Sequence, residues 1–527
     1  MDAGSGRDAR GDATFDLEKG VCEERFSSDD ESLRTVVGRL DSRLSSTTTI
    51  KSQADSFNAL GSNRKSFDTL KLISTDASHA AEKDTVEVVV TRTDDLPPPV
   101  GPSLLQTIRW HFFSTYRKIF TFIFAANVSI LVAALVTGCV ASNWVATCVT
   151  VNLFVSIIVR NEHVVNLLFA ISTSLPRSSP LWLRRTFAKV YSYGGMHSGC
   201  GVGAVAWYIW YTVNTFRNFD SSGYSVASLI LTCIILLLLL LIITFAHPTL
   251  REKHHNHFEV IHRFAGWTVL LLFWAQTMVV TIQEVHQAGR PMGRMLVVNP
   301  SFWLLVGISL CVVYPWSRTR LQSVDAEPLS NHALRLHFAH DTVDACTSLR
   351  IGDNPLKETH AFALIPEPDG RKGFSMVVSN AGDWTKRIIK DPPKRIWVKG
   401  VPAWGVLCVA TMFDPVVIVA TGSGIGPCLG LFNGRPSLNC RVIWSVKSPE
   451  ETYGKEIVET VFRADPKALI IDTNKEGRPD LAPLTYNMWK EAKAEAVIVI
   501  SNMTLTTNLV FEMESRGIPS FGPIWDS

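Results

Sequence analysis

The chain has 527 residues, of which 46% are hydrophobic and 19% are charged, and its formal net charge is +3. Soluble domains average about 25% charged residues, so this deficit indicates apolar surroundings. The near-neutral balance gives no support for nucleic-acid binding. The ten cysteines are spread singly, without a C-x-x-C pair, which argues against a disulfide scaffold and against a structural zinc site.

Residues 1–103 are predicted to form a disordered cytosolic tail. Ser, Thr, Asp, Gly and Arg dominate this stretch, and so polar a segment cannot bury enough apolar area to offset its ordering entropy. It ends in Leu96–Pro102, a proline-rich composition typical of a stiff linker. The many hydroxyl residues are either phosphorylation targets or simply part of a solvated tail.

Residues 104–317 are predicted to form a six-span transmembrane domain. The clearest span is Val226–Ala246, which carries no charge and is long enough to cross the hydrocarbon layer as a helix. Two other segments are mixed in composition and contain ionisable residues or several glycines. In chain order the predicted spans are Ile119–Cys139, Asn143–Thr173, Phe187–Val213, Val226–Ala246, Phe264–Ile282 and Ser301–Tyr314.

Lys and Arg concentrate in the loops on one side of these spans. The opposite loops hold only Arg217, Arg290 and Arg294. The positive-inside rule then predicts a multi-pass membrane protein, partnered by lipid, with both termini in the cytosol. The basic residues on the predicted cytosolic side are Arg109, Arg117, Lys118, Arg177, Arg184, Arg185, Arg251, Lys253, Arg263, Arg318 and Arg320.

Several ionisable residues fall inside the predicted spans. Arg160, Glu162 and His163 either pair with each other or with a neighbour near the cytosolic end of the second span, or extend to the membrane surface. His197 and His262 stand on the third and fifth spans, where two facing imidazoles could be axial ligands of a haem iron. The alternative for both histidines is an ordinary packing or hydrogen-bonding role.

Residues 318–412 show short segments typical of a small antiparallel barrel. Leu334–Phe338, Gly373–Val378 and Arg395–Lys399 alternate between apolar and polar residues and are separated by turn signals.

Residues 413–527 change to the pattern of an α/β nucleotide-binding domain. Val416–Ala420 is a fully apolar strand, and a glycine-rich turn follows it directly and opens a helix. Backbone N–H groups of such a turn can hold a phosphate at the positive end of the helix; the alternative is a turn that serves only tight packing. Further strands are expected at Arg441–Ser445, Ala468–Ile471 and Ala496–Ile500. The turn consists of Thr421, Gly422, Ser423, Gly424, Ile425, Gly426 and Pro427.

The order of these three regions resembles the ferric reductase/NADPH oxidase superfamily, with a cytosolic half similar to ferredoxin–NADP reductase modules. Within it, the chain resembles fungal integral membrane flavoproteins of the TmpA type over about Leu104–Ser527. The segments that carry this resemblance are Phe258–Trp267, Gly382–Thr385, Gly477–Asp480 and Phe521–Ser527.

This resemblance implies a bound FAD, a bound NAD(P)H and a set of contact residues. The turn at 421–427 would hold the dinucleotide phosphates, Gly400 would open the loop beside the flavin pyrophosphate, and Trp525 would cover the flavin ring. The flavin strand would be His360, Ala361, Phe362 and Ala363, and the next motif would be Gly382, Asp383, Trp384 and Thr385. No catalytic residue is assigned.

Departures from the superfamily pattern limit the prediction. Ala363 replaces a hydroxyl residue beside the flavin, and Ser501-Asn502 replaces a Cys-Gly pair. The positions for a second histidine pair hold Trp210 or Tyr211 and Ala275 or Gln276, so one haem at most is expected.

The resulting hypothesis is a membrane-bound oxidoreductase that passes electrons from NAD(P)H through FAD to a membrane haem or another acceptor. Lys447 could favour NADPH, or it could simply be solvated. The alternative is a regulatory or sensor membrane protein with a reductase-like module that binds nucleotide or flavin but is weakly catalytic.

Overall fold

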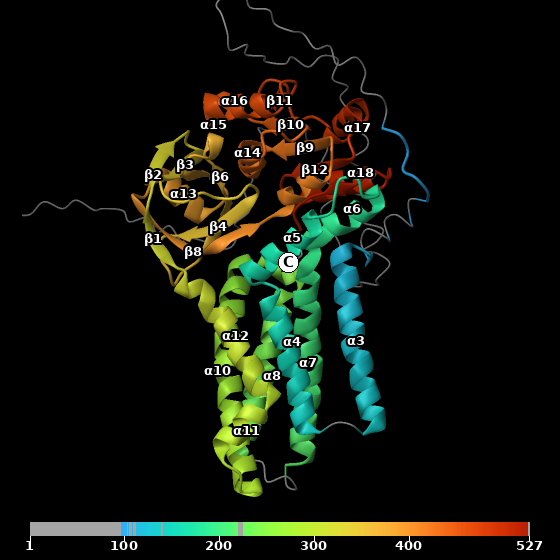
Figure 1. Cartoon of the computed structure of the whole chain (residues 1–527), viewed down its shortest axis with the longest axis vertical. Helices are drawn as coiled ribbons and strands as arrows, with labels where there is room; N and C mark the ends of the chain where they lie inside the picture. Colours follow the sequence, from blue (N-terminus) through green and yellow to red (C-terminus); the bar gives the residue numbers. More distant parts are fainter. Residues whose placement is uncertain are drawn as a thin grey trace, which may run out of the picture. The chain divides into compact units, whose positions relative to one another are not determined.

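The structure is a computed structural model and describes residues 96–102, 104, 108, 112–138, 141–219 and 225–524 (Figure 1). All of these lie in one compact unit of the chain. The predicted tail up to residue 95 lies outside the described residues, and so does Trp525.

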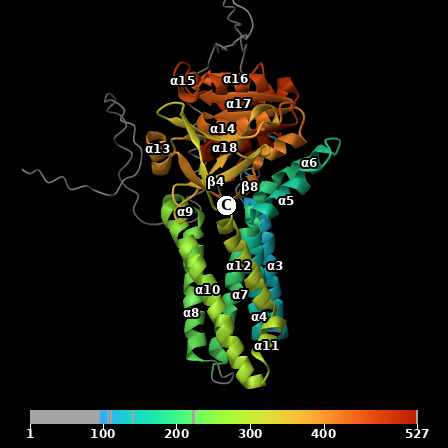
Figure 2. The same ribbon diagram turned by 60° about the vertical axis from the view of Figure 1, so that its left-hand side comes forward.

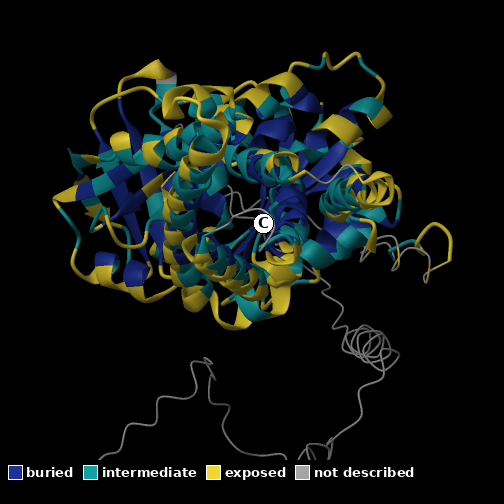
Figure 3. Cartoon of the chain, turned by 90° about the horizontal axis from the view of Figure 1, so that it is seen from below, coloured by how far each residue is buried: buried dark blue, intermediate teal, exposed yellow. Residues whose placement is uncertain are grey.

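The first half of the described chain is helical, and its long helices run side by side (Figure 2). Helix α7 packs against α3, α4 and α8, while α10 packs on α8 and α12 packs on α4. Figure 3 shows exposed residues along the outer faces of these helices. The elements are α3 (Thr115–Thr137), α4 (Ser142–Ile158), α5 (Glu162–Thr173), α6 (Leu181–Phe187), η2 (Ala188–Tyr193), α7 (Gly194–Arg217), α8 (Val226–Ala246), α9 (Pro248–Lys253), α10 (His255–Ala288), α11 (Met292–Val298) and α12 (Pro300–Ser317).

The number of candidate membrane helices differs from the prediction. Among the described residues, four helices are long and apolar enough to cross a membrane: α3, α8, α10 and α12. A fifth candidate is the pair α4 and α5, which is bent by 71° at a short break. Helix α7 does not qualify, because glycines and His197 lower the apolar character of its first turns. The predicted six-helix transmembrane bundle is therefore not confirmed.

The break between α4 and α5 changes the interpretation of the second predicted span. Asn161 caps α5 by accepting a hydrogen bond from the His163 backbone N–H at 3.0 Å. Beyond this cap, Val165 and Phe169 are buried in the same hydrophobic core as η4 (Val406–Met412) and the parallel sheet. Helix α5 therefore packs on the domains that follow, and its charged first turn lies at the bend.

The three ionisable residues of this bend do not pair with one another. Arg160 lies over the ring of Tyr193, 5.7 Å from its centroid, and His163 Nε2 hydrogen-bonds the Tyr314 hydroxyl at 2.7 Å. Of the expected alternatives, Arg160 and His163 thus follow the one in which the partner is a neighbouring side chain, here an aromatic one.

Two four-stranded antiparallel sheets follow the helices. Their strand orders are β1-β8-β4-β5 and β2-β3-β7-β6, and apolar side chains of both sheets form one core. The predicted strands are present, but two separate sheets take the place of one closed barrel. The elements are β1 (Arg320–Ser323), β2 (Asp325–Pro328), β3 (Ala333–Phe338), β4 (Thr347–Gly352), β5 (His360–Ala363), β6 (Ile365–Pro366), η3 (Pro368–Gly370), β7 (Phe374–Ser379), α13 (Asp383–Lys390) and β8 (Arg395–Trp404).

The last region is a five-stranded parallel sheet of order β11-β10-β9-β12-β13, as the apolar strand pattern predicted. One face of β9 packs on α14 and α16, and the other packs on α17 and α18, so the sheet is covered on both sides. The elements are β9 (Val416–Thr421), η5 (Gly422–Gly424), α14 (Ile425–Gly434), β10 (Cys440–Val446), α15 (Pro449–Tyr453), α16 (Lys455–Ala464), β11 (Leu469–Asp472), α17 (Leu481–Ala492), β12 (Ala496–Ile500), α18 (Met503–Glu514) and β13 (Ser520–Phe521).

Candidate nucleotide and flavin site

The glycine turn lies where the strand order of the parallel sheet reverses. Thr421 ends β9, residues 422–424 form η5, and Ile425 begins α14. Strand β9 stands between β10 and β12 and is parallel to both. In open α/β sheets, ligands bind beyond the carboxyl ends of the strands at such a switch point, and the helix N-terminus there favours phosphate.

A close backbone contact explains why residue 424 is glycine. A Cβ at this position would lie 2.1 Å from the carbonyl oxygen of Ile500, which ends β12. Gly422 adopts a φ of +47°, and its carbonyl oxygen accepts a hydrogen bond from Trp444 Nε1 at 3.1 Å. Two glycines of the motif are therefore needed for packing and for backbone conformation, whether or not the turn also binds phosphate.

The end of β12 contributes the other half of this edge. The hydroxyl groups of Thr421 and Ser501 form a short hydrogen bond across the two strands. Asn502 caps α18 by accepting a hydrogen bond from the Leu505 backbone N–H at 2.9 Å. The N-termini of α14 and α18 thus meet at one edge of the sheet, with a pair of hydroxyl groups between their strands.

Helix α14 packs unusually closely against the antiparallel sheets. A Cβ on Gly430 would lie 2.4 Å from the Leu364 carbonyl oxygen, and a Cβ on Gly434 would lie 2.4 Å from the Ala345 Cβ. Leu364 directly follows β5, the predicted flavin strand. Because these glycines allow close packing, the turn at 421–427 and the predicted flavin strand β5 lie on neighbouring elements.

The predicted flavin strand β5 lies at the edge of its sheet. It pairs only with β4, so one side of its backbone has no strand neighbour in the described sheet. The His360 ring lies 4.5 Å from the Trp384 ring, centroid to centroid, and Phe362 stacks on the same indole at 6.0 Å. Ala363, which lacks the expected hydroxyl group, pairs with Ser348 on β4.

The Gly382–Thr385 motif forms the start of α13. The Thr385 hydroxyl oxygen accepts hydrogen bonds from the backbone N–H groups of Ala381 and Gly382, at 2.9 and 3.0 Å. Asp383 is exposed, whereas Trp384 is buried and donates from Nε1 to Asp353 at 2.6 Å. The motif therefore acts locally as a helix cap with a core tryptophan.

Asp353 is held ionised by these contacts. Burial tends to raise the pKa of its carboxyl group, but hydrogen bonds from Trp384 and Arg387 outweigh that effect, and the pKa is lowered. Arg387 Nη2 lies 2.7 Å from the Asp353 carboxylate. The ionised Asp353 thus hydrogen-bonds the Trp384 indole, against which His360 and Phe362 of β5 pack.

Gly400 lies against helix α5. Its φ is +77°, and a Cβ there would lie 2.6 Å from the Glu162 carboxylate. Nearby, the Asn166 amide donates to the Pro402 carbonyl oxygen and accepts from the Trp404 N–H, each at 2.9 Å. The predicted pyrophosphate loop therefore carries the junction between α5 and β8, and its contact with a flavin stays a prediction.

The edge beyond β10 and β11 carries groups of both charges. Lys447 is exposed after β10, and the Asp472 carboxylate accepts hydrogen bonds from the Ser448 and Asn474 backbone N–H groups at 2.9 and 3.0 Å. Burial tends to raise the pKa of Asp472, but these hydrogen bonds outweigh it and lower the pKa. With both charges present, this edge does not by itself select NADH or NADPH.

His197 and His262 lie close together in the helical region. Their ring centroids are 6.2 Å apart, and the rings are tilted by 58°. At the position of a second histidine, Gln276 donates to the Thr232 hydroxyl at 2.8 Å and accepts from the Tyr208 hydroxyl at 3.1 Å. That position is thus occupied by a polar network that links α7, α8 and α10.

One buried ion pair escaped the sequence analysis. Arg184 on α6 binds both carboxylate oxygens of Glu495, at 2.6 and 2.7 Å, and also donates to the Met412 carbonyl oxygen at 2.9 Å. The hydrogen bond from Arg184 lowers the pKa of Glu495. The two residues are 311 positions apart, so no local pattern indicates the pair.

Comparisons with known proteins identify relatives of this chain. A family model described as adenylate-forming reductase 03009, C-terminal domain, matches residues 406–527. Adenylate-forming reductases 03009 and 06235 of Coprinopsis cinerea are 43% and 42% identical to this chain over 89% and 87% of its length. The alignments cover 46% and 44% of those proteins, so the chain spans about half the length of the curated relatives it matches.

Part of the chain is also similar to solved structures. Full-length CYP116B46 from Tepidiphilus thermophilus is 15% identical with a TM-score of 0.33, and the match covers 40% of this chain and 29% of that chain. Phthalate dioxygenase reductase is 15% identical with a TM-score of 0.30, and the match covers 38% and 65%. At these scores the fold assignment rests on the strand order and register described above.

The resemblance to TmpA-type proteins of the ferric reductase/NADPH oxidase superfamily is therefore corrected, because the relatives found are named adenylate-forming reductases. The comparisons also give no support for a haem. Of the segments behind the resemblance, Phe258–Trp267 lies within helix α10 and Gly382–Thr385 forms the start of α13, so these local features could not separate one family from another.

Proposed function

We propose that this chain is an NAD(P)H-dependent flavoprotein reductase module. The observation that carries the proposal is the glycine turn at the switch point of the parallel sheet. The helix that this turn opens, α14, packs closely against the end of the predicted flavin strand, β5. Both relatives are named reductases. The family model that matches residues 406–527 is described as the C-terminal domain of one of them. We therefore assign a reduction reaction to this chain, which spans about half the length of those relatives.

The residues present fit a dinucleotide at the turn. The first turn of α14 offers the positive end of a helix, and Ser423 is exposed there. The paired hydroxyl groups of Thr421 and Ser501 lie at the same edge. These groups would bind the phosphates and orient the nicotinamide toward the antiparallel sheets.

The residues of β5 fit a flavin ring. An edge strand keeps free backbone donors and acceptors on its outer side, which is what a planar heterocycle with alternating polar atoms needs. His360 Nε2 is buried without a hydrogen-bond partner among the described residues, although it lies 3.9 Å from the Glu358 carboxylate. FAD bound here would supply hydride acceptance and one-electron release; the strand would hold and orient its ring.

Membrane insertion of the helical half is part of the proposal. Large apolar side chains face outward on the candidate helices; Phe122 on α3 and Leu271 on α10 are 76% and 70% exposed. Contiguous apolar surface of this kind is typical of a membrane or an interaction site. With the Lys and Arg distribution, it supports insertion with both termini and the reductase domains on the cytosolic side.

The electron acceptor is the finer part of the proposal, and the His197–His262 pair is its structural basis. The ring centroids of His197 and His262 are 6.2 Å apart, so these two imidazoles would be the residues that hold a metal ion bound between them. The His197 Nδ1 atom lies 2.8 Å from the Ser156 carbonyl oxygen, which leaves Nε2 for a metal. A haem iron between these rings would accept single electrons.

An absorption spectrum and a mixing experiment test the proposal. The full chain purified in detergent should carry about one FAD, and NADPH added without oxygen should bleach the flavin band within a catalytic turnover time. A Soret band would support the haem, and its absence would remove that part alone. A chain that binds neither flavin nor pyridine nucleotide would overturn the reductase assignment.

A sensor is the second candidate, because Ala363 lacks a hydroxyl group beside the proposed flavin and a serine replaces the expected cysteine at position 501. A sensor need not transfer hydride quickly. Flavin that binds at full occupancy but is bleached only over minutes would favour the sensor over the reductase.

A further inference from the structure

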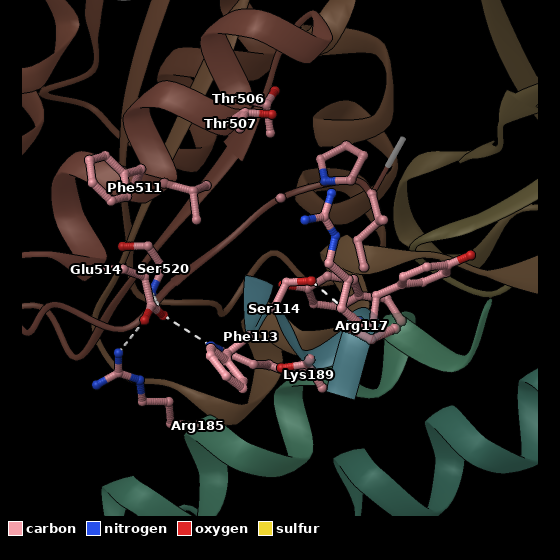
Figure 4. Close-up of a pocket in the computed structure, with 18 of the residues that line it drawn as sticks. Phe113, Ser114, Arg117, Arg185, Lys189, Thr506, Thr507, Phe511, Glu514 and Ser520 are labelled. Carbon is pink, nitrogen blue, oxygen red and sulfur yellow. Dashed lines mark hydrogen bonds and ion pairs between the residues drawn. The ribbon is translucent and has the colours of Figure 1, made fainter. Parts of the chain in front are cut away.

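Helix α6 is amphipathic in the opposite sense to a helix that faces water. Arg184 is buried in its ion pair with Glu495. Arg185 is paired with Glu514 of α18 (Figure 4). The large apolar residues lie on the outside instead, and those exposed are Leu181, Trp182 and Phe187. Charged side chains normally cover the outer side of a helix that faces water, so this reversal indicates apolar surroundings for α6.

Helix α5 has an outer face of the same kind. Val165 and Phe169 are buried in the hydrophobic core that includes the parallel sheet. On the other side of the helix, Leu167 and Ile171 are 58% and 55% exposed, and they lie on one stripe because they are four residues apart. Ala170 is exposed beside them. Helix α5 therefore carries apolar residues on two sides, and only the inner side packs on the domains that follow.

The bend before α5 determines which way this outer face points. The 17 residues of α4 are enough to cross the hydrocarbon layer, and α5 is bent by 71° from α4. If α4 crosses a membrane with the usual tilt of about 20°, α5 runs closer to the membrane plane than to its normal. In Figure 1, α5 and α6 lie between the long helices and the parallel-sheet domain. Since the inner side of α5 packs on that domain, its outer side faces the membrane surface.

The exposed apolar surface continues from α6 toward α3. Segment η2 follows α6 directly and packs against both α6 and α3. On α3, which is a candidate membrane helix, Phe122 is 76% exposed, and Phe113 just before this helix is 55% exposed. Trp182 is 69% exposed beside this level, and tryptophan is enriched where a membrane meets water. The outer faces of α5 and α6 are thus continuous with a surface that we propose to be in lipid.

From these observations we infer that α5 and α6 lie in the interface of the cytosolic leaflet, where their outer faces contact lipid. We call this surface the interfacial face; it consists of Leu167, Ala170, Ile171, Leu181, Trp182 and Phe187. Because the face is apolar, it fits the boundary between headgroups and acyl chains and requires no particular headgroup. The inference rests on the proposed membrane insertion of the helical half, but not on the flavin chemistry. Contact with lipid along α5 and α6 holds the reductase domains close to the membrane.

Photocrosslinking of the full chain in nanodiscs of palmitoyl-oleoyl phosphatidylcholine tests the inference. The photoreactive residue p-benzoylphenylalanine is introduced at one position at a time, and mass spectrometry identifies the molecule to which it becomes joined. Trp182→p-benzoylphenylalanine and Ile171→p-benzoylphenylalanine should each give lipid adducts. Adducts with protein alone, from a second copy or from another segment of this chain, would overturn the inference in favour of a protein partner.

Two reference positions distinguish the possible failures. Phe122 on α3 reports membrane insertion, and Glu459 is exposed on α16, at the end of the reductase domains far from the long helices (Figures 1 and 2). Lipid adducts at 122 but not at 171 and 182 would overturn the interfacial face and leave insertion intact. Loss of the adducts at all three positions would overturn insertion and the inference together. Adducts at 459 equal to those at 182 would mean non-specific reaction and would also overturn it.

A second measurement uses the unsubstituted chain, so it does not depend on how a variant folds. Two phosphatidylcholine probes carry a diazirine, one near the glycerol backbone and one at the end of an acyl chain. An interfacial helix enters only about 5–10 Å into the boundary, so the glycerol probe should label α5 and α6 and the chain-end probe should label mainly the candidate spans. Absence of label on α5 and α6 from both probes would overturn the inference. Flavin reduction is followed separately as absorbance, so failure of the reductase proposal gives a different result.

Discussion

Gly424 and Gly426 of the switch-point turn differ in what surrounds them, and this difference predicts different effects of the same substitution. In Gly424→Ala the new methyl group would lie 2.1 Å from the Ile500 carbonyl oxygen and 2.9 Å from its carbonyl carbon. Ordinary carbon–oxygen contacts are about 3.3–3.6 Å, so the turn must separate from β12 by more than roughly 1 Å. Because both neighbouring atoms belong to the backbone, no side-chain rotation relieves the contact.

The expected cost follows from this displacement. Overpacking a well-packed core costs about 1–3 kcal/mol, and here it also disturbs the pairing of Ile500 with Ala420 at the end of the sheet. Gly424 has a φ of −60°, so alanine brings no backbone strain of its own. We expect a lower unfolding temperature and at least tenfold weaker binding of NADPH.

Gly426→Ala is the matched control two residues further on. Its Cβ would lie 3.8 Å from the Val377 Cβ, an ordinary van der Waals contact, and alanine favours the helix by about 0.5–1 kcal/mol. NADPH affinity, measured by titrating the full chain in detergent and following nucleotide fluorescence, should stay near the wild-type value. NADPH binding that is unchanged in Gly424→Ala, or lost equally in Gly426→Ala, would refute the placement of the dinucleotide.

Three further predictions concern the junctions between domains. Because Arg184 lowers the pKa of Glu495, this pair stabilises the fold at pH values above the unfolded carboxyl pKa of about 4.5. Its contribution is lost as the pH falls through the lower pKa of the folded state. In Glu495→Gln, the unfolding temperature should therefore fall less steeply as the pH is lowered. Asn166→Asp removes the donor to the Pro402 carbonyl oxygen and should destabilise the α5–β8 junction by about 1–3 kcal/mol, seen as faster proteolysis there than in Asn166→Gln. Burial, with Arg350 and Arg263 nearby, lowers the pKa of Lys399 to about 8, so amine labelling followed by mass spectrometry should half-saturate near pH 8 at Lys399.

The parallel sheet could be predicted from sequence because its strands are buried on both faces. Val416–Ala420 and Ala496–Ile500 are continuous apolar runs of strand length, and both are strands in the structure. The glycine turn could be predicted for a similar reason. A glycine-rich segment between a buried strand and a helix start has few other conformations available. The facing arrangement of His197 and His262 was a hypothesis for the third and fifth predicted spans, and the distance between their rings could not be predicted.

The bend after Ile158 shows where hydrophobicity alone fails. Averaged over residues 143–173, the apolar content is that of one membrane span, and such an average cannot detect a 71° turn. A local signal was present: Asn161 followed by Glu162 is a typical helix start, with a capping side chain and an acidic first residue. Hydropathy alone therefore predicts one membrane span where the chain forms two helices, the second of which docks on β8.

The docking of α5 has a consequence for how the helical half and the reductase domains work together. Val165, Phe169 and Ala188 lie before the predicted boundary at residue 318, yet they belong to one hydrophobic core with the parallel sheet. Arg184 of the same region forms an ion pair with Glu495. The Asn166 side chain forms a hydrogen bond with the backbone of β8. Because a shared core is close-packed, α5 and η2 should move together with the parallel sheet, whereas α4 and α7 pack in a separate hydrophobic core. The short break at 159–161 therefore separates α4, in the core of the helical half, from α5, which packs on the domains that follow.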